Sequence, residues 1–239
     1  MKKLDKIYEG KAKIMYLTTD PNLLIQYFKD DATAFDGQKK GQIVNKGILN
    51  NQISSHLFER LEAQGISTHF VSRLSDREML VKKLDIIPVE LIVRNVVAGS
   101  LAKRMGLAEG TPLKERVLEL YYKNDALHDP MLNEYHIRTF GLAADEELAQ
   151  MLEMADRVNK ILKEIFARVG IRLIDFKLEF GRHQGDILLG DEITPDGCRL
   201  WEVGTDEKMD KDRFRRDLGR VEEAYQEVAR RLLNRAESD

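Results

Sequence analysis

Charged and apolar side chains alternate along residues 173–181, which read LIDFKLEFG. Successive side chains of an extended strand point to opposite faces, so Asp175, Lys177 and Glu179 share one face, opposite the bulky apolar residues. This pattern has two interpretations. The charged face is either the solvated side of an antiparallel sheet, with the lysine neutralised by its neighbours, or a working face. On a working face, carboxylates would hold a metal ion and the ammonium group would hold an anion.

A further carboxylate, Asp191, follows Glu179 after the turn signal RHQG. A hairpin would bring these two acids near each other, although the strand register decides whether they share a face. Two carboxylates beside a nucleotide polyphosphate are the usual way to hold Mg²⁺, which prefers oxygen ligands and keeps several waters. Lys177 would then meet a carboxylate or phosphate of the substrate. A salt-bridged, solvated strand is the alternative.

Lysines follow a glycine in the segment YEGKAK. Gly10 lets the backbone approach a ligand, and Lys11 and Lys13 on one side of a strand suit a polyphosphate. A plain hairpin with exposed lysines would have the same sequence. The segment therefore permits phosphate binding without requiring it.

A strand followed by a helix start is predicted in VRNVVAGSLAKR. Ser100 is suited to cap a helix beginning at Leu101, and free N–H groups at a helix start attract anions. Arg94, earlier on the strand, could add a bidentate contact to the same phosphate. An ordinary capped helix beside a surface arginine is the alternative.

Two polar loops supply further candidates. TAFDGQKKG places Asp36 in a turn, and KNDALHDPML carries Lys123, His128 and Asp129. His128 beside Asp129 could form an acid–base pair, although a hydrogen bond within the loop is the simpler interpretation. The sequence contains neither a Gly-x-Ser-x-Gly elbow nor a Walker A lysine motif, which argues against covalent catalysis by a side chain.

Composition restricts the class of protein. The 239 residues are 43% hydrophobic and 33% charged, which is typical of a soluble globular chain. The net charge of −3 disfavours wholesale binding to nucleic acid. The single cysteine, Cys198, excludes an intramolecular disulfide and argues against a structural zinc site. No apolar run is long enough to span a membrane and the first residues show no signal-peptide pattern, so we expect a cytoplasmic protein.

The order of predicted elements indicates an α+β fold. The first hundred residues favour short strands around one helix at residues 45–64. Two long amphipathic helices are predicted at residues 144–169 and 210–235, with a strand meander between them. We therefore expect a strand-rich N-terminal lobe beside a mixed C-terminal lobe.

Six sequence blocks together carry a resemblance to a known family. KIYEGKAK, LVKKLDIIPVELIVRNVVAGSLAKR, KNDALHDPMLNE, LIDFKLEFG, LGDEITPDGCRLW and EKMDKDRFRRDLG occur in this order. In order and spacing they resemble the SAICAR synthetases (phosphoribosylaminoimidazole-succinocarboxamide synthases) over essentially the whole chain. The resemblance implies a two-lobed fold around an ATP cleft, distantly akin to protein kinases, and a homodimer. Residues 1–90 would be the strand-rich lobe contributing to ATP binding, and residues 91–239 the mixed lobe binding ribonucleotide, Mg²⁺ and aspartate.

The resemblance also implies a reaction and its site. ATP, L-aspartate and carboxyaminoimidazole ribonucleotide would give SAICAR, ADP and phosphate through an acyl phosphate, in purine biosynthesis. The implied ATP-binding residues are Lys11, Lys13, Lys82, Glu90 and Lys123, and the implied ribonucleotide-binding residues are Asp36, Arg94 and Ser100. The implied catalytic residues are Asp175, Lys177 and Arg199, and the implied metal ligands are Glu179, Asp191 and Asp129.

Two other functions compete with the ligase. A kinase acting on a small molecule or protein is disfavoured by the absence of the HRD and DFG set. A nucleotide-binding regulator without turnover would use the charged face only to sense its ligand. The chain also departs from the family at Glu202-Val203-Gly204, where an aspartate and a lysine-containing loop are usual.

Overall fold

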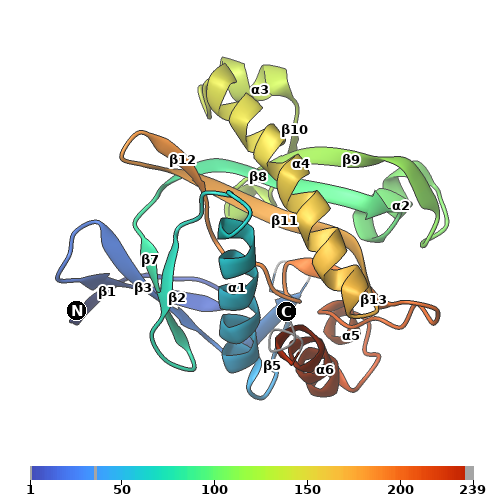
Figure 1. The fold of residues 1–239 in the computed structure, drawn as a ribbon. Coiled ribbons are helices and arrows are strands. Elements are labelled where there is room, and N and C mark those ends of the chain that lie inside the picture. Colours follow the sequence, from blue (N-terminus) through green and yellow to red (C-terminus); the bar gives the residue numbers. More distant parts are fainter. Residues whose placement is uncertain (1, 35–36, 235–239) are drawn as a thin grey trace.

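The computed structural model describes residues 2–34 and 37–234, and it contains two main antiparallel sheets (Figure 1). Asp36 lies outside the described residues. The first sheet has the strand order β1-β2-β3-β7-β6. Its strands are β1 (Lys3–Glu9), β2 (Lys13–Thr18), β3 (Leu23–Phe28), β7 (Glu78–Lys82) and β6 (Phe70–Arg73). A separate ribbon pairs β4 (Asp31–Ala34) with β5 (Lys39–Gln42).

Helix α1 (Lys46–Glu62) packs against β3, β7 and β6 of the first sheet, and its bounds are close to the range expected from its periodicity. Its apolar residues recur at helical spacing, and Ile53, Leu57 and Leu61 are fully buried. They join a single hydrophobic core that also includes side chains of the second sheet. The two sheets are therefore packed as one body.

The second sheet has the order β10-β9-β8-β11-β12, and β13 also pairs with β11. Its strands are β8 (Asp85–Val96), β9 (Pro112–Tyr122), β10 (Met131–Leu132), β11 (Ile171–His183), β12 (Asp186–Leu189) and β13 (Cys198–Glu202). Because β8 begins at Asp85, the chain passes between the sheets at residues 83–84. The domain boundary at residue 90 remains a prediction.

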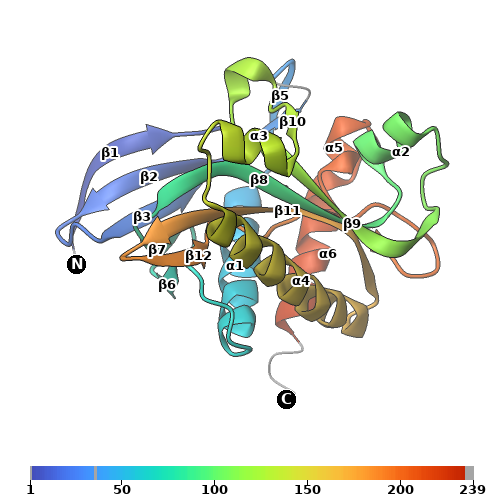
Figure 2. The same cartoon turned by 90° about the horizontal axis from the view of Figure 1, so that it is seen from above.

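The long helix α4 (Asp145–Arg168) crosses one face of the second sheet, as Figure 2 shows from above. This helix confirms the expectation for residues 144–169. The remaining helical segments are short: α2 (Gly99–Met105), the 3₁₀ turn at Asp125–Leu127, α3 (Glu134–Thr139) and α5 (Asp212–Arg215).

The single helix expected at residues 210–235 is wrong. The segment forms α5 and a separate helix α6 (Val221–Leu233). Asp217, Gly219 and Arg220 between them have positive φ angles of 55°, 68° and 51°. The left-handed region cannot continue a right-handed helix, so the chain turns there. The turn lets α6 pack against α1.

Candidate active site

Strand β11 carries the charged face predicted from residues 173–181. In the β8–β11 register, Glu179 lies opposite Glu90 and Asp175 opposite Arg94. The apolar side chains of Phe176 and Leu178, between Asp175 and Glu179, are buried on the face beneath α4. Asp175 and Glu179 are only 3% and 4% exposed, so the interpretation as a solvated face is wrong.

A cluster of lysines and carboxylates forms where β11 meets the residue that follows β12. The Lys177 Nζ lies 2.7 Å from Glu179 Oε1 and 3.1 Å from Asp191 Oδ2. Two carboxylates that contact one ammonium group must lie close together, so the structure brings Glu179 and Asp191 into one site. Lys123 Nζ also contacts Glu179, at 2.8 Å, and Glu90 Oε2 lies 3.4 Å from Lys177 Nζ.

Lys13 from the first sheet completes this cluster. It pairs with Asp191, and its Nζ lies 3.1 Å from Glu192 Oε2. Burial alone would raise the pKa of the Glu179 carboxyl, but Lys177, Lys13 and Lys123 outweigh burial and hold that pKa well below its ordinary range. Glu179 is therefore a carboxylate at neutral pH.

Burial acts differently on Glu90. It raises the pKa of the Glu90 carboxyl, and the nearby Lys177 offsets this only in part. Burial would by itself lower the pKa of the Lys177 ammonium, but Glu179 and Glu90 hold that pKa above its ordinary value. Lys177 is therefore a fixed cation at the centre of the cluster.

The paired acids fit the donor chemistry of Mg²⁺, because both offer carboxylate oxygens at a partly enclosed site. Within residues 2–34 and 37–234, no group of three or more histidine, cysteine or acidic side chains is placed to hold a metal ion. Glu179 and Asp191 would therefore supply two ligands, and polyphosphate oxygens and water the others. Asp129 accepts a hydrogen bond from the backbone of Asn124 in its own loop, at 2.7 Å.

A cleft of about 280 Å³ opens beside the cluster and lies between the two sheets. Lys13, Lys82, Lys123, Glu179 and Asp191 line its charged part. Its other walls are mostly apolar and comprise Ile7, Tyr8, Met15, Leu24, Val81, Leu84 and Ile86, together with Gln26 and His69. A cleft with mostly apolar walls and a charged part of lysines and acids suits a nucleotide, whose base is apolar and whose phosphates are charged.

Two of the expected ATP-binding lysines hold other contacts. Lys11 lies in the turn between β1 and β2, and its Nζ is 2.9 Å from Asp125 Oδ1 in the loop after β9. Lys82 Nζ donates to the Thr68 carbonyl oxygen at 3.1 Å. Lys82 lines the cleft, whereas Lys11 is not among the residues that line it.

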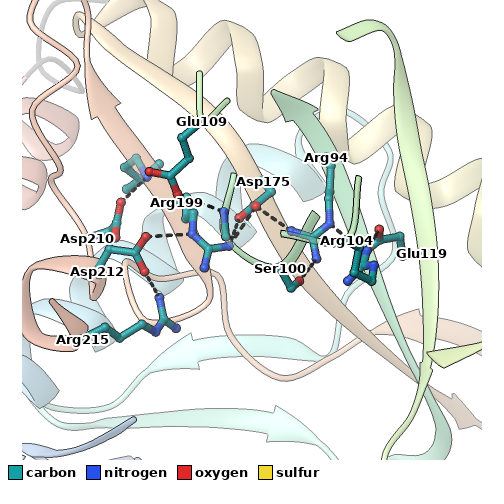
Figure 3. A network of polar contacts seen from close by, with 12 residues as sticks. Arg94, Ser100, Arg104, Glu109, Glu119, Asp175, Arg199, Asp210, Asp212 and Arg215 are labelled. Carbon is teal, nitrogen blue, oxygen red and sulfur yellow. Dashed lines mark hydrogen bonds and ion pairs between the residues drawn. The ribbon is translucent and has the colours of Figure 1, made fainter. Parts of the chain in front are cut away.

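A second polar network lies further along the same face of the sheet (Figure 3). Arg94 is buried and donates to Glu119 Oε2 at 2.6 Å, to Asp175 Oδ2 at 2.8 Å and to Ser100 Oγ at 3.0 Å. Arg199 donates to the same Asp175 oxygen at 2.9 Å. The structure thus brings together Arg94, Ser100, Asp175 and Arg199.

The expected capping role of Ser100 is wrong. The residue before α2 is Ala98, and Ser100 lies inside the first turn, where its Oγ accepts from Arg94. Gly99 explains the geometry of this turn. Its φ is 53°, and a Cβ atom there would lie 2.5 Å from Arg199 Nη2. Only glycine allows the turn to approach the guanidinium so closely.

Some residues of this network carried no sequence signal of their own. Asp212 accepts from Arg199 Nε at 2.9 Å and from Arg215 Nη1 at 2.6 Å. Glu119 holds Arg94 and also pairs with Arg104. Asp212 and Arg215 belong to the block EKMDKDRFRRDLG, but the strand and helix residues of this network meet only through tertiary packing.

Comparisons of the sequence with known proteins identify one family. The family model described as SAICAR synthetase matches residues 6–232. The chain belongs to the SAICAR synthetase family. A phosphoribosylaminoimidazole-succinocarboxamide synthase of Clostridium kluyveri is 59% identical over 232 residues, covering 97% of this chain and 99% of that protein. One of Zymomonas mobilis is 57% identical, covering 97% and 91% of the two chains.

Solved structures agree with the sequence comparisons. The crystal structure of the Ehrlichia chaffeensis synthase superposes with a TM-score of 0.94 at 51% identity, covering 95% of this chain and 98% of that one. A SAICAR synthetase in complex with ADP gives 0.93 at 52% identity, covering 96% and 98%. The expected α+β SAICAR-synthase-like fold and the expected class, an ATP-dependent carbon–nitrogen ligase, are confirmed.

The departure from the family pattern at Glu202 has a local structural role. Glu202 Oε1 accepts from Arg231 Nη2 of α6 at 2.6 Å, and Glu202 Oε2 accepts from Thr205 at 2.9 Å. These contacts tie the loop after β13 to α6. Among the described residues, no helix is long and apolar enough to cross a membrane.

His69 predicts a pH dependence of stability. Burial, followed by the charges of Lys13 and Lys82, lowers its pKa from 6.5 to about 3. Between these values the unfolded chain binds a proton that the folded chain excludes, so stability decreases as pH falls from 6.5 toward 3. We expect His69→Phe to remove up to about 1.4 kcal/mol per pH unit from the slope of unfolding free energy against pH.

Urea unfolding at several pH values between 4 and 7 measures this slope. The Phe ring preserves the edge-on packing of His69 on Phe58, whose ring centroid is 5.2 Å away. Equal slopes for the His69→Phe variant and the unsubstituted protein would show that the buried ring does not exclude its proton.

Proposed function

We propose that this protein joins L-aspartate to carboxyaminoimidazole ribonucleotide through an acyl-phosphate intermediate, giving SAICAR, ADP and phosphate in de novo purine biosynthesis. The observation that carries the proposal is the face of β11. One strand presents a carboxylate for the metal site, Glu179, and a member of the arginine network, Asp175, with Lys177 between them. Four residues of strand span about 13 Å, which separates the two sites but keeps them within reach of one bound ribonucleotide.

The chemistry requires an activated carboxylate. An ionised carboxylate resists attack by an amine because it would have to expel an oxide. Transfer of the γ-phosphoryl group of ATP to a carboxylate oxygen releases ADP and creates a phosphate leaving group. The aspartate nitrogen then bonds to the acyl carbon, the carbon–oxygen bond to phosphate breaks, and the nitrogen loses its proton to solvent or a base.

The residues of the site assist by positioning and by neutralising charge. Lys177, fixed as a cation, would face the negative charge that develops on the transferred phosphoryl group. Glu179 and Asp191 would hold Mg²⁺, which supplies charge neutralisation on the polyphosphate when bound. Arg94, Ser100 and Arg199 would hold the ribonucleotide, and Lys13, Lys82 and Lys123 would contact ATP phosphates. No protein nucleophile is required.

The remaining assignments stay proposals of the same kind. Lys11 would reach the phosphates by exchanging Asp125 for them, and Glu90 would lie beside the nucleotide. Asp36 would contact the ribonucleotide, and Asp129 would help to hold a second metal ion. The complex of a related SAICAR synthetase with ADP supports nucleotide binding by this chain. We further propose that the protein is cytoplasmic and forms a homodimer. Light scattering of the purified protein measures its oligomeric state.

An ADP-release assay tests the function. The protein is incubated with ATP, Mg²⁺ and ribonucleotide, with and without aspartate, and the product is identified by mass spectrometry. A ligase releases ADP in steady state only when both co-substrates are present. Release without aspartate would indicate a kinase, and no release in any mixture would indicate a regulator.

Isotope transfer tests the intermediate. If the carboxylate of the ribonucleotide is labelled with ¹⁸O, the acyl-phosphate route moves one labelled oxygen into the released phosphate. Unlabelled phosphate from a reaction that produces SAICAR would contradict this route.

Substitution of Arg94 should weaken binding of the ribonucleotide. We expect Arg94→Lys to raise KM for the ribonucleotide at least about 10-fold, because lysine lacks the planar fork that reaches Glu119, Asp175 and Ser100 together. Ser100→Ala, which removes one hydroxyl, should have a smaller effect. Steady-state kinetics with ATP and aspartate saturating measure both, and an unchanged KM in Arg94→Lys would refute the phosphate-binding assignment.

A further inference from the structure

Two buried polar side chains on the inner wall of the cleft each have a nitrogen without a hydrogen-bond partner. Gln26 is 1% exposed and His69 is 3% exposed, and both line the cleft. In the part of the chain that the structure describes, neither Gln26 Nε2 nor His69 Nε2 has a hydrogen-bond partner. A buried polar group left unpaired destabilises a protein, so two in one cleft indicate that a ligand pairs with them.

The position of Gln26 indicates which part of the ligand it meets. It lies on β3 opposite Met15 of β2 and Met79 of β7, and two residues from Leu24. Met15 and Leu24 belong to the apolar wall of the cleft, whereas the charged groups lie around Asp191. An uncharged amide within the apolar wall faces the part of a nucleotide that has no charge, which is the base.

His69 adds a second polar group to the lining of the cleft. Burial and nearby lysines lower its pKa to about 3, so the ring is neutral at physiological pH. A neutral imidazole donates through one nitrogen and accepts through the other. Gln26 and His69 are therefore both polar but uncharged groups in the lining of the cleft.

The chemistry of an amide points to one base. A glutamine side chain can donate to N7 of adenine and accept from its N6 amino group, whereas guanine offers two acceptors at these positions. We propose that Gln26 is a specificity-determining residue that pairs with the N6/N7 edge of adenine. The inference rests on the proposed function, because it takes the bound nucleotide to be ATP.

Equilibrium binding by calorimetry tests this inference without turnover. We expect Gln26→Leu to weaken Mg²⁺–ADP binding at least about 10-fold and to reduce the preference for ADP over GDP. The unsubstituted protein should bind 7-deaza-ADP, which lacks N7, more weakly than ADP, and Gln26→Leu should change that affinity much less. Pyrophosphate, which has no base, should bind both proteins equally.

Two further variants make the result specific. Lys160→Met, at an exposed position of α4 outside the cleft, should leave the ADP affinity and the ratio of ADP to GDP affinity unchanged. Gln26→Met is a second variant of similar length, used with circular dichroism to show that the fold is retained. Unchanged ADP affinity in a folded Gln26 variant, or equal losses for ADP and 7-deaza-ADP, would overturn the inference.

The binding experiment and the turnover experiment distinguish failure of the adenine contact from failure of the proposed function. If the protein shows no ligase turnover but Gln26→Leu still loses affinity for ADP, the adenine contact stands and the proposed function falls. If turnover requires aspartate and ribonucleotide but the Gln26 variants bind ADP normally, the proposed function stands and the adenine contact falls.

Discussion

Replacing Lys177 by methionine should lower kcat about 10²- to 10³-fold. The ammonium group contacts Glu179 and Asp191 and lies near Glu90, so it is the common cation of the cluster. Loss of one preorganised group that stabilises developing charge typically reduces kcat by this factor. The methionine side chain is similar in length and removes the charge together with the N–H donors of the ammonium group. ADP release at saturating substrates measures the effect.

Lys160→Met is the matched control for this prediction. Lys160 is an exposed residue of α4, the helix that covers the opposite face of the sheet. The Lys160→Met variant should retain full activity. If Lys177→Met keeps the circular dichroism spectrum and the kcat of the unsubstituted protein, Lys177 does not take part in the reaction.

Replacing Lys46 by methionine should lower the free energy of unfolding by about 3–5 kcal/mol, because the buried Asp196 carboxylate loses its nearest cation and keeps only Lys211, at 4.0 Å. Lys46 is fully buried, and its Nζ lies 2.5 Å from Asp196 Oδ2. Asn50 donates to the same oxygen at 3.0 Å, and the Tyr225 hydroxyl donates to Asp196 Oδ1 at 2.7 Å. This network joins α1, the turn before β13 and α6. Urea unfolding at pH 7 measures the loss.

A double substitution separates the missing charge from lost packing. Lys46→Met with Asp196→Asn removes both charges, so it should be more stable than Lys46→Met alone. A loss below about 1 kcal/mol in Lys46→Met would mean that water enters and solvates Asp196, contrary to the burial of the pair.

The alternation at residues 173–181 predicted that Asp175, Lys177 and Glu179 share one face, because the period of a strand is local. The pairing of β8 with β11 joins residues about 80 positions apart, so the meeting of Arg94 and Asp175 could be expected only from the family resemblance. Ser100 was assigned the wrong local role, since its hydroxyl is engaged by a guanidinium from another strand. The break between α5 and α6 was missed because the apolar stripe continues through residues of positive φ.

Gln26, His69 and Lys46 could not have been found from sequence alone. Each is a polar residue within an ordinary strand, loop or helix pattern, and only tertiary packing buries it. These side chains matter because burial removes them from water, and the spacing of residues in the sequence does not show which polar residues are buried.

The pairing of β8 with β11 makes the candidate active site intolerant of insertions and deletions. The register shifts that adjoin β11 lie between Leu173 and Asp175 and between Glu179 and Gly181, and they enclose an uninterrupted ladder from Asp175 to Glu179. Losing one residue inside this ladder would exchange the two faces and drive acids beneath α4. Length variation among homologous chains should therefore accumulate at the RHQG hairpin tip, and the five residues of the ladder should keep constant spacing.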